Sequence, residues 1–184
     1  MRREAMPPTS FVTFSCHARN HWLASPIVRD QVAVSFAAAT AGGSIDLHAW
    51  VVMSNHVHVL ATDARCAVGP WLSAFRKEFS LSARNALRDE LPAEARSGQF
   101  WLRGGGHRRL IWSWQEYWQK VHYIHSNPTR AGLCESATGW RWSSAIEYSG
   151  QQRAGMPQVA DPPEGLVDLL WWRGPSDPFG VDRH

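Results

Sequence analysis

The sequence predicts an α+β fold in which helices cover a central antiparallel sheet, as in a ferredoxin-like sandwich. The expected elements follow one another as strand, helix, strand, strand, helix, short strand and helix, which is the order of that fold. Two of the strands are separated only by Ser54 and Asn55 and therefore predict a hairpin. The chain has 184 residues, which is enough for one domain with a sizeable core.

The first strand and the first helix are marked by residue type. Phe11–Cys16 is a short run rich in β-forming residues. Ser25 then provides an N-cap in front of a proline, which predicts a helix over Pro26–Ala41. The Gly-Gly pair that follows ends this helix.

The hairpin strands are expected at Ile45–Met53 and His56–Thr62, because both runs are apolar and rich in β-branched residues. The next segment, from Gly69 to about Arg88, is expected to form an amphipathic helix, because large apolar side chains recur in it at helical spacing. These side chains are Trp71, Leu72, Phe75 and Phe79.

The last elements follow a loop-rich stretch from Leu91 to Gly106. Leu110–Trp112 is expected as a short strand. Ser113 and Glu116 have the spacing of a capping box, so a helix is expected to begin at Ser113 and to end at Pro128.

The composition changes beyond Tyr148, where Gly, Pro, Gln and Asp become frequent. We therefore expect a domain over residues 1–150 and a C-terminal tail or appendage over residues 151–184. A short apolar patch from Leu166 to Trp172 lies within this tail.

Composition and charge exclude several classes of protein. The three cysteines, Cys16, Cys66 and Cys134, form no CxxC pair, so neither a disulfide framework nor a zinc ribbon is expected. No segment has the ~18 apolar residues of a membrane span, and the start lacks a signal peptide, so a cytoplasmic protein is expected. The formal net charge of +3 and the 11 tryptophans are compatible with a nucleic-acid partner without requiring one.

Two histidines are placed to share a ligand. His56 and His58 are two residues apart on an expected strand, so both imidazoles project from one face while Val57 points away. At roughly 6–7 Å apart along the strand, they can converge on one divalent ion. The alternative is that the pair only decorates a half-exposed strand.

The last helix carries a second candidate pair. At about 100° per residue, one side of it is expected to face the core. That side contains Trp114, Tyr117, Trp118 and Val121. Tyr123 is expected on the opposite side, with Asn127 one turn further along the same face. This placement favours a functional role, and the alternative is an ordinary surface tyrosine with Asn127 ending the helix.

Three segments are recognisable when taken together. They are AWVVMSNHVHVLAT at Ala49–Thr62, YIHSNPTRAGL at Tyr123–Leu133 and WRWSSAIEY at Trp140–Tyr148. In this order and at these distances they resemble the REP-associated tyrosine transposases, a branch of the single-tyrosine HUH transposase family. The resemblance extends over about residues 10–150 and implies the HUH endonuclease fold.

The resemblance also implies an activity and its residues. Such a transposase cleaves and rejoins single-stranded DNA beside palindromic hairpins, through a 5′-phosphotyrosine link and a free 3′-hydroxyl. By resemblance, His56 and His58 bind the metal, Tyr123 is the nucleophile and Asn127 supplies a further metal ligand. A phenol can form such a covalent intermediate, and a nearby cation helps it to attack because an unperturbed tyrosine has a pKa near ~10.

The resemblance also indicates the cofactor and the partners. A divalent metal, Mg²⁺ or Mn²⁺, is the expected cofactor. The expected partner is single-stranded DNA with palindromic hairpins, and neither a nucleotide cofactor nor a membrane is expected. Both a monomer and a dimer are compatible with this family.

Basic side chains are candidates for DNA contacts. The candidates are Arg76 and Lys77 on the second helix, and Arg103, Arg108 and Arg109 beside Trp101 and Trp112. Cations follow phosphates, and aromatic side chains stack on unpaired bases. For each of these residues the alternative is a solvated charged face.

Two other functions are weighed against a transposase. A histidine-triad nucleotide hydrolase also has alternating histidines on a strand, but it needs a third histidine where this chain has Leu60. A domesticated transposase that binds hairpins without cutting them is the non-enzymatic alternative. The presence of all four implied site residues weighs against that alternative.

Overall fold

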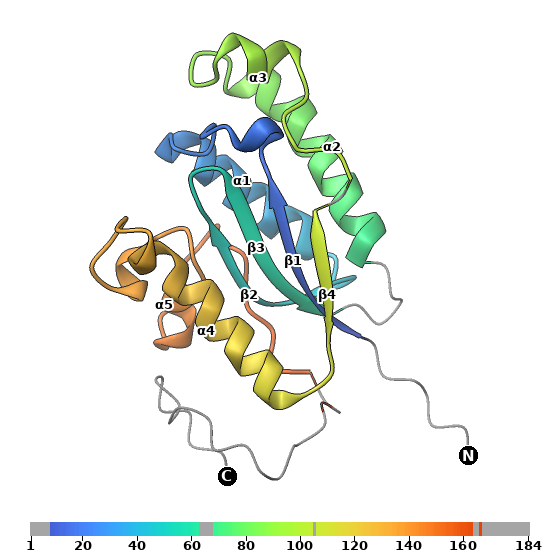
Figure 1. The fold of residues 1–184 in the computed structure, drawn as a ribbon, viewed down its shortest axis with the longest axis vertical. Coiled ribbons are helices and arrows are strands. Elements are labelled where there is room, and N and C mark those ends of the chain that lie inside the picture. Colours follow the sequence, from blue (N-terminus) through green and yellow to red (C-terminus); the bar gives the residue numbers. More distant parts are fainter. Residues whose placement is uncertain (1–7, 63–67, 105, 164–165, 167–184) are drawn as a thin grey trace.

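The computed structural model describes residues 8–62, 68–104, 106–163 and 166, which form a four-stranded sheet with helices on both faces (Figure 1). The strands are β1 (Thr9–Ser15), β2 (Asp46–Val52), β3 (His56–Thr62) and β4 (His107–Ile111). Neighbouring strands are antiparallel, and their order across the sheet is β2-β3-β1-β4. The predicted α+β sandwich is confirmed.

Three longer helices and several short ones complete the described part of the chain. The longer helices are α1 (Pro26–Thr40), α2 (Val68–Ala86) and α4 (Trp114–Arg130). The short ones are η1 (His17–Arg19), α3 (Ala93–Ser97), η2 (Ala137–Gly139) and α5 (Ala145–Tyr148). Of these, α3 lies within the stretch that the sequence predicted as loop. No helix of the described residues is both long and apolar enough to cross a membrane.

Helices α1 and α2 pack against one face of the sheet. Phe14 of β1 contacts Phe36 of α1 and Phe75 of α2, with ring centroids 6.1 and 6.2 Å apart. Phe36 and Phe75 stack on each other at 4.1 Å. Leu72 and Phe79 of α2 are buried in the same layer, as the predicted apolar stripe requires. Because each buried side chain of this size contributes about 1.5–3 kcal/mol, this layer supplies much of the stability.

Helix α4 covers the opposite face of the sheet. Phe11 precedes Phe14 by three residues on β1, so its side chain points to the other face. There the Phe11 ring stacks on His58 of β3, with centroids 5.5 Å apart, and meets the edge of Tyr123 of α4 at 5.8 Å. His58 and Tyr123, two of the polar residues singled out by the sequence, therefore lie between α4 and the sheet.

The helical spacing predicted Tyr123 on the side of α4 that faces away from the core. In the structure this prediction is wrong. The Tyr123 side chain is half-buried and its ring packs against the sheet. The physical reason is that α4 is buried over a wide part of its circumference. Besides Tyr117 and Val121, Ile124 and His125 are buried, because the segment after α4 folds back against the helix.

Helix α4 also continues past Pro128, where the sequence predicted its end. A proline in the last turn removes one N–H donor, but its fixed φ is compatible with a helix. Beyond the proline, the backbone N–H of Ala131 still donates to the carbonyl of Asn127. Gly132, with a φ of 68°, then takes the left-handed conformation that ends many helices.

Strand β4 begins at His107 and ends at Ile111, whereas the sequence predicted Leu110–Trp112. Its first three residues are exposed, so no apolar pattern marked them. The strand forms because β1 pairs with it, and Thr13 lies opposite His107. Gly106 precedes this pair, and a Cβ there would lie 2.0 Å from the Thr13 carbonyl oxygen, so the position needs a glycine.

The segment after α4 covers the free edge of β2. The backbone N–H of Val52 donates to the carbonyl of Trp142, and the Trp50 N–H donates to Ser144 Oγ. Further along, the Ala160 N–H donates to the carbonyl of Leu47. Part of the predicted tail therefore packs on the domain. Residues 167–172 of the predicted apolar patch lie outside the described residues.

Candidate active site

Strand β3 brings the two histidines together. His56 and His58 project from the same face of the strand, as predicted, with ring centroids 4.7 Å apart. Their Nε2 atoms approach to 3.1 Å. At this distance the two nitrogens either share a hydrogen bond or face a common cation.

Each imidazole is held at its other nitrogen. His56 Nδ1 donates to the amide oxygen of Asn55 at 2.7 Å, which leaves the lone pair on Nε2. His58 Nδ1 lies 2.7 Å from the hydroxyl oxygen of Thr13, the residue that pairs with His58 in the β1–β3 ladder. Contacts of this kind orient metal-binding histidines in proteins.

Burial lowers the pKa of both histidines. It lowers the pKa of His58 to about 3, with smaller contributions from His56 and Lys120. It lowers the pKa of His56 to about 4, with smaller contributions from Arg19 and His21. Both imidazoles are therefore neutral at pH 7, which is the form that binds a metal ion.

The histidine pair fits a divalent ion. With metal–nitrogen bonds of about 2.1 Å, two adjacent ligands of one ion are about 3 Å apart, which matches the Nε2 separation. Among the described residues, no group of three or more His, Cys, Asp or Glu side chains is placed to hold a metal ion. The remaining ligands would then be amide, water or phosphate oxygens, which Mg²⁺ and Mn²⁺ accept.

Tyr123 lies next to this pair. Its ring meets the ring of His58 edge-on, with centroids 5.2 Å apart. Asn127 is one turn further along α4, where its Nδ2 donates to the carbonyl of Tyr123 at 2.6 Å. That bond leaves the Asn127 Oδ1 atom for another partner. The structure thus brings His56, His58 and Tyr123 together, while Asn127 contacts the backbone of Tyr123.

Sequence reasoning missed several residues of this site, among them Thr13 and Lys120. Thr13 contacts His58, but only the strand pairing shows this. Lys120 lies one turn before Tyr123, and its Nζ is 4.7 Å from the centre of the Phe11 ring and 5.4 Å from that of Tyr123. The helical spacing of Lys120 and Tyr123 was the one signal that could have found Lys120.

The predicted DNA contacts on β4 are divided between the two faces of the sheet. Arg109 lies opposite Phe11 in the strand register and so shares the face of Tyr123. It forms an ion pair with Glu116. Arg108 points to the other face, where its Nε donates to Ser10 Oγ at 3.0 Å. The residues were adjacent in sequence, but strand alternation separates them.

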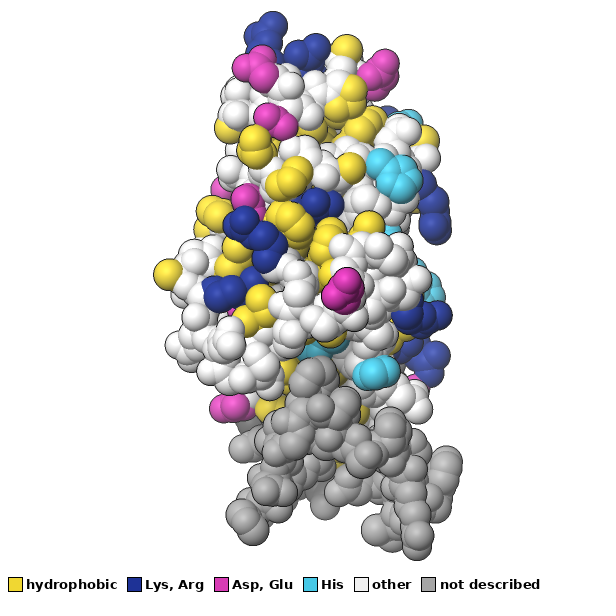
Figure 2. Space-filling view, turned by 90° about the vertical axis from the view of Figure 1, so that its left-hand side faces the viewer, with side chains coloured by type: hydrophobic (Ala, Val, Ile, Leu, Met, Phe, Trp, Pro, Cys, Tyr) yellow, Lys and Arg dark blue, Asp and Glu magenta, His cyan; other side chains and the backbone are white. Residues whose placement is uncertain are grey.

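The other predicted contacts lie in the layer of α2. Arg76 donates to the carbonyl of Leu102, and Arg103 donates through Nε to the side-chain oxygen of Gln99 at 2.9 Å. Arg76 and the exposed Lys77 line an open pocket of about 270 Å³. Figure 2 shows Lys and Arg side chains in separate groups, interspersed with other side chains, on the face that it presents. The candidate cations do not form one surface around Tyr123.

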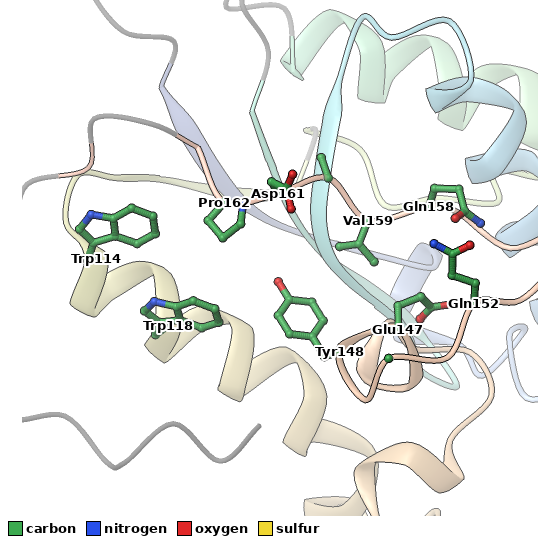
Figure 3. Close-up of a pocket in the computed structure, with 11 residues that line it drawn as sticks. Trp114, Trp118, Glu147, Tyr148, Gln152, Gln158, Val159, Asp161 and Pro162 are labelled. Carbon is green, nitrogen blue, oxygen red and sulfur yellow. The ribbon is translucent and has the colours of Figure 1, made fainter. Parts of the chain in front are cut away.

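A larger pocket, of about 560 Å³, lies between α4, α5 and the described part of the tail (Figure 3). Trp114 and Trp118 of α4 line one side of it, and Tyr148 of α5 lines another. Neither histidine of the pair nor Tyr123 lines this pocket. The candidate site between α4 and the sheet is therefore separate from this pocket.

The comparisons with known proteins identify the fold. No family model and no curated protein matches the sequence. Among solved structures, the chain is similar to the REP-associated tyrosine transposase bound to a REP hairpin, with a TM-score of 0.64 and 15% sequence identity. The match covers 88% of this chain and 98% of that one. The chain thus has the fold of a HUH transposase over most of its length.

Proposed function

We propose that this protein is a metal-dependent, single-strand DNA endonuclease and strand transferase that acts beside palindromic hairpins in DNA transposition. The observation that carries the proposal is the contact between Tyr123 and His58, whose Nε2 converges with that of His56. A candidate nucleophile and a candidate metal site thus lie side by side.

The structural neighbour supports the class of partner. It is a REP-associated tyrosine transposase, and its structure contains a REP hairpin. The similarity covers 88% of this chain and 98% of that one. Hairpin DNA is therefore the substrate to test first.

In the proposed reaction the phenol oxygen of Tyr123 attacks the phosphorus of one phosphodiester bond. The new O–P bond forms as the P–O3′ bond breaks, and the phenol proton passes to the leaving O3′ oxygen, directly or through water. The products are a 5′-phosphotyrosine and a free 3′-hydroxyl. Attack by a 3′-hydroxyl on the phosphotyrosine reverses the exchange and rejoins DNA without a nucleotide cofactor.

His56 and His58 would hold the metal ion through Nε2, with Oδ1 of Asn127 as a further ligand. Mg²⁺ or Mn²⁺ bound there would supply positive charge to the phosphate oxygens. Asn55 and Thr13 keep the two imidazoles oriented. Phe11 supports the rings of both His58 and Tyr123 from the sheet.

The test is the capture of a covalent adduct. End-labelled DNA hairpins with randomised single-stranded flanks are incubated with the protein and Mg²⁺ or Mn²⁺, and denaturing gels separate free DNA from protein-linked DNA. We expect an adduct with the wild-type protein and none with Tyr123→Phe. Replacement of His56 or His58 by alanine should abolish cleavage but leave most hairpin binding, because phosphate contacts elsewhere carry the affinity.

Tyr148→Phe is the matched control, since the Tyr148 hydroxyl donates to the carbonyl of His48 and not to the candidate site. It should still form the adduct. An adduct that persists in Tyr123→Phe would overturn the assignment of the nucleophile. Hairpin binding without any adduct would favour a binding protein that does not cut DNA.

A further inference from the structure

Lys120 stands out among the cations near Tyr123, because none of the described carboxylates neutralises its charge. It is half-buried on α4, and its ammonium group lies over the Phe11 ring and close to the Tyr123 ring. Within the described part of the chain, no carboxylate forms an ion pair with it. The acid one turn before it, Glu116, is taken by Arg109. The three donors of the ammonium group are thus available to an anion.

Four other cations already have partners within the protein. Arg109 is paired with Glu116, and Arg108 donates to Ser10. Arg76 and Arg84 donate to backbone carbonyl groups on the far side of the sheet. None of these four makes a ring contact with Tyr123 in the described structure.

A second observation places the charge of Lys120 near the histidine pair. The two rings beside its ammonium group, Phe11 and Tyr123, both contact the ring of His58, with centroids 5.5 and 5.2 Å apart. A half-buried charge acts more strongly on its surroundings than one in water, because the effective dielectric constant is lower there. An anion that approached Tyr123 would experience the same field.

We propose that Lys120 binds the scissile phosphate, as a catalytic residue that donates to one of its non-bridging oxygens while Tyr123 attacks the phosphorus. This inference rests on the proposed function and adds the residue that recognises the reacting group. The same contact would serve both cleavage and rejoining, since the phosphate is held in both steps.

The test measures coupling between the charge of Lys120 and the charge of individual phosphates. A hairpin is first selected for binding to Tyr123→Phe, which cannot cut it. Neutral methylphosphonates then replace the linkages of its single-stranded flank, one at a time. Lys120→Met keeps the length and the apolar contact of the side chain and removes only the charge.

We expect Lys120→Met to weaken binding of the unmodified hairpin by roughly tenfold or more, as for a hydrogen bond to a charged group. With a methylphosphonate at one particular linkage, the proteins with and without the Lys120→Met substitution should bind the hairpin equally well. That linkage should be the one that Tyr123 cuts. Lys77→Met is the charge-matched control. Because Lys77 lies on α2, any loss of affinity caused by Lys77→Met should be the same for the unmodified hairpin and for the hairpin with that methylphosphonate.

A second readout does not depend on substitution. Lys77 and Lys120 are the two lysines of the chain, so methylation of lysines with ¹³C gives one NMR signal for each besides that of the N-terminal amine. The Lys120 signal should move when the hairpin binds, and it should move less with the methylphosphonate at the cut linkage. Lys120→Arg should restore part of the lost affinity.

The outcomes separate this inference from the proposed function. Equal losses on all DNAs, or coupling at a linkage other than the cut one, would overturn the role of Lys120 even if the wild-type protein forms the adduct. Coupling at a single linkage without any adduct would leave the phosphate contact standing and overturn the proposed chemistry. Absence of DNA binding would overturn both.

Discussion

The two faces of the sheet are built from different chemistry, although both are covered by helices. Between the sheet and α1 and α2, aromatic rings such as Phe14, Phe36 and Phe75 pack on one another. Between the sheet and α4, the rings include His58 and Tyr123. The first layer is built mainly of phenylalanine rings, with Trp71 and Trp101 packed among them. In the second layer the imidazole of His58 contacts the hydroxyl group of Thr13. Because the first layer supplies apolar burial, the second can hold polar side chains such as those of the proposed active site.

The largest expected effect comes from breaking the apolar layer. Phe36 is fully buried and stacks on Phe75, so Phe36→Ala should lower the free energy of unfolding by about 3–5 kcal/mol. Tyr123→Phe, in the other layer, keeps the ring and should change it by less than about 0.5 kcal/mol. Chemical denaturation of both variants measures this contrast. If Tyr123→Phe were equally destabilising, Tyr123 would be a structural residue and the contrast would fail.

The second effect is a pH dependence that belongs to the α4 layer. His125 is buried, and burial lowers its pKa to about 3. The unfolded chain therefore binds more protons than the folded one below pH ~6.5, so stability is complete above that pH and is lost as the pH falls toward 3. At pH 5 the loss from one such histidine is roughly 2 kcal/mol.

Denaturation curves at pH 7 and pH 5 test this prediction. His125→Gln cannot take up a proton, so it should show a smaller difference between the two curves than the wild-type protein. Phe36→Leu, in the apolar layer, should lower stability by the same amount at both pH values. An unchanged pH difference in His125→Gln would contradict a buried, neutral histidine at this position.

Features that depend on neighbours in the sequence could be predicted from it. The hairpin, the ends of α1 and the common face of His56 and His58 follow from residue type and from the two-residue period of a strand. They do not depend on how the elements dock. The histidine pair could therefore be predicted from the sequence, and its role as a metal-ligand set stays a prediction.

Features that depend on docking could not be predicted. Tyr123 packs on Phe11 and His58 because of how α4 docks on the sheet, and the apolar spacing of the helix alone does not specify this docking. The pairing of Thr13 with His58 requires the β1–β3 register, which joins residues 45 positions apart. Strand β4 is exposed over its first three residues, so its position is set by pairing with β1 rather than by an apolar pattern.

A smaller effect should come from the support of the histidine pair. Thr13→Val removes the hydroxyl that contacts His58 Nδ1 and should weaken Mn²⁺ binding about 10–100-fold, as loss of such a support does in metal sites. Titration with Mn²⁺ alone, without DNA, gives this affinity. Thr13→Ser keeps the hydroxyl and should retain most of it. Equal binding by Thr13→Val and the wild-type protein would show that His58 needs no support from β1.

The smallest effect is expected at the starts of α1 and α4, the helices that cover opposite faces of the sheet. Ser113 Oγ accepts a hydrogen bond from the backbone N–H of Glu116 and so caps α4, whereas Ser25, at the start of α1, donates its hydroxyl to Glu90. Ser113→Ala should therefore lower the free energy of unfolding by about 1 kcal/mol, and Ser25→Ala by less than half of that. Because the cap fixes only the first turn, Ser113→Ala should leave Tyr123 in place and adduct formation within about twofold of wild type. Equal costs for the two serines in urea denaturation would show that the cap on α4 contributes no more than an exposed hydrogen bond, and that the docking of α4 depends on its buried side chains alone.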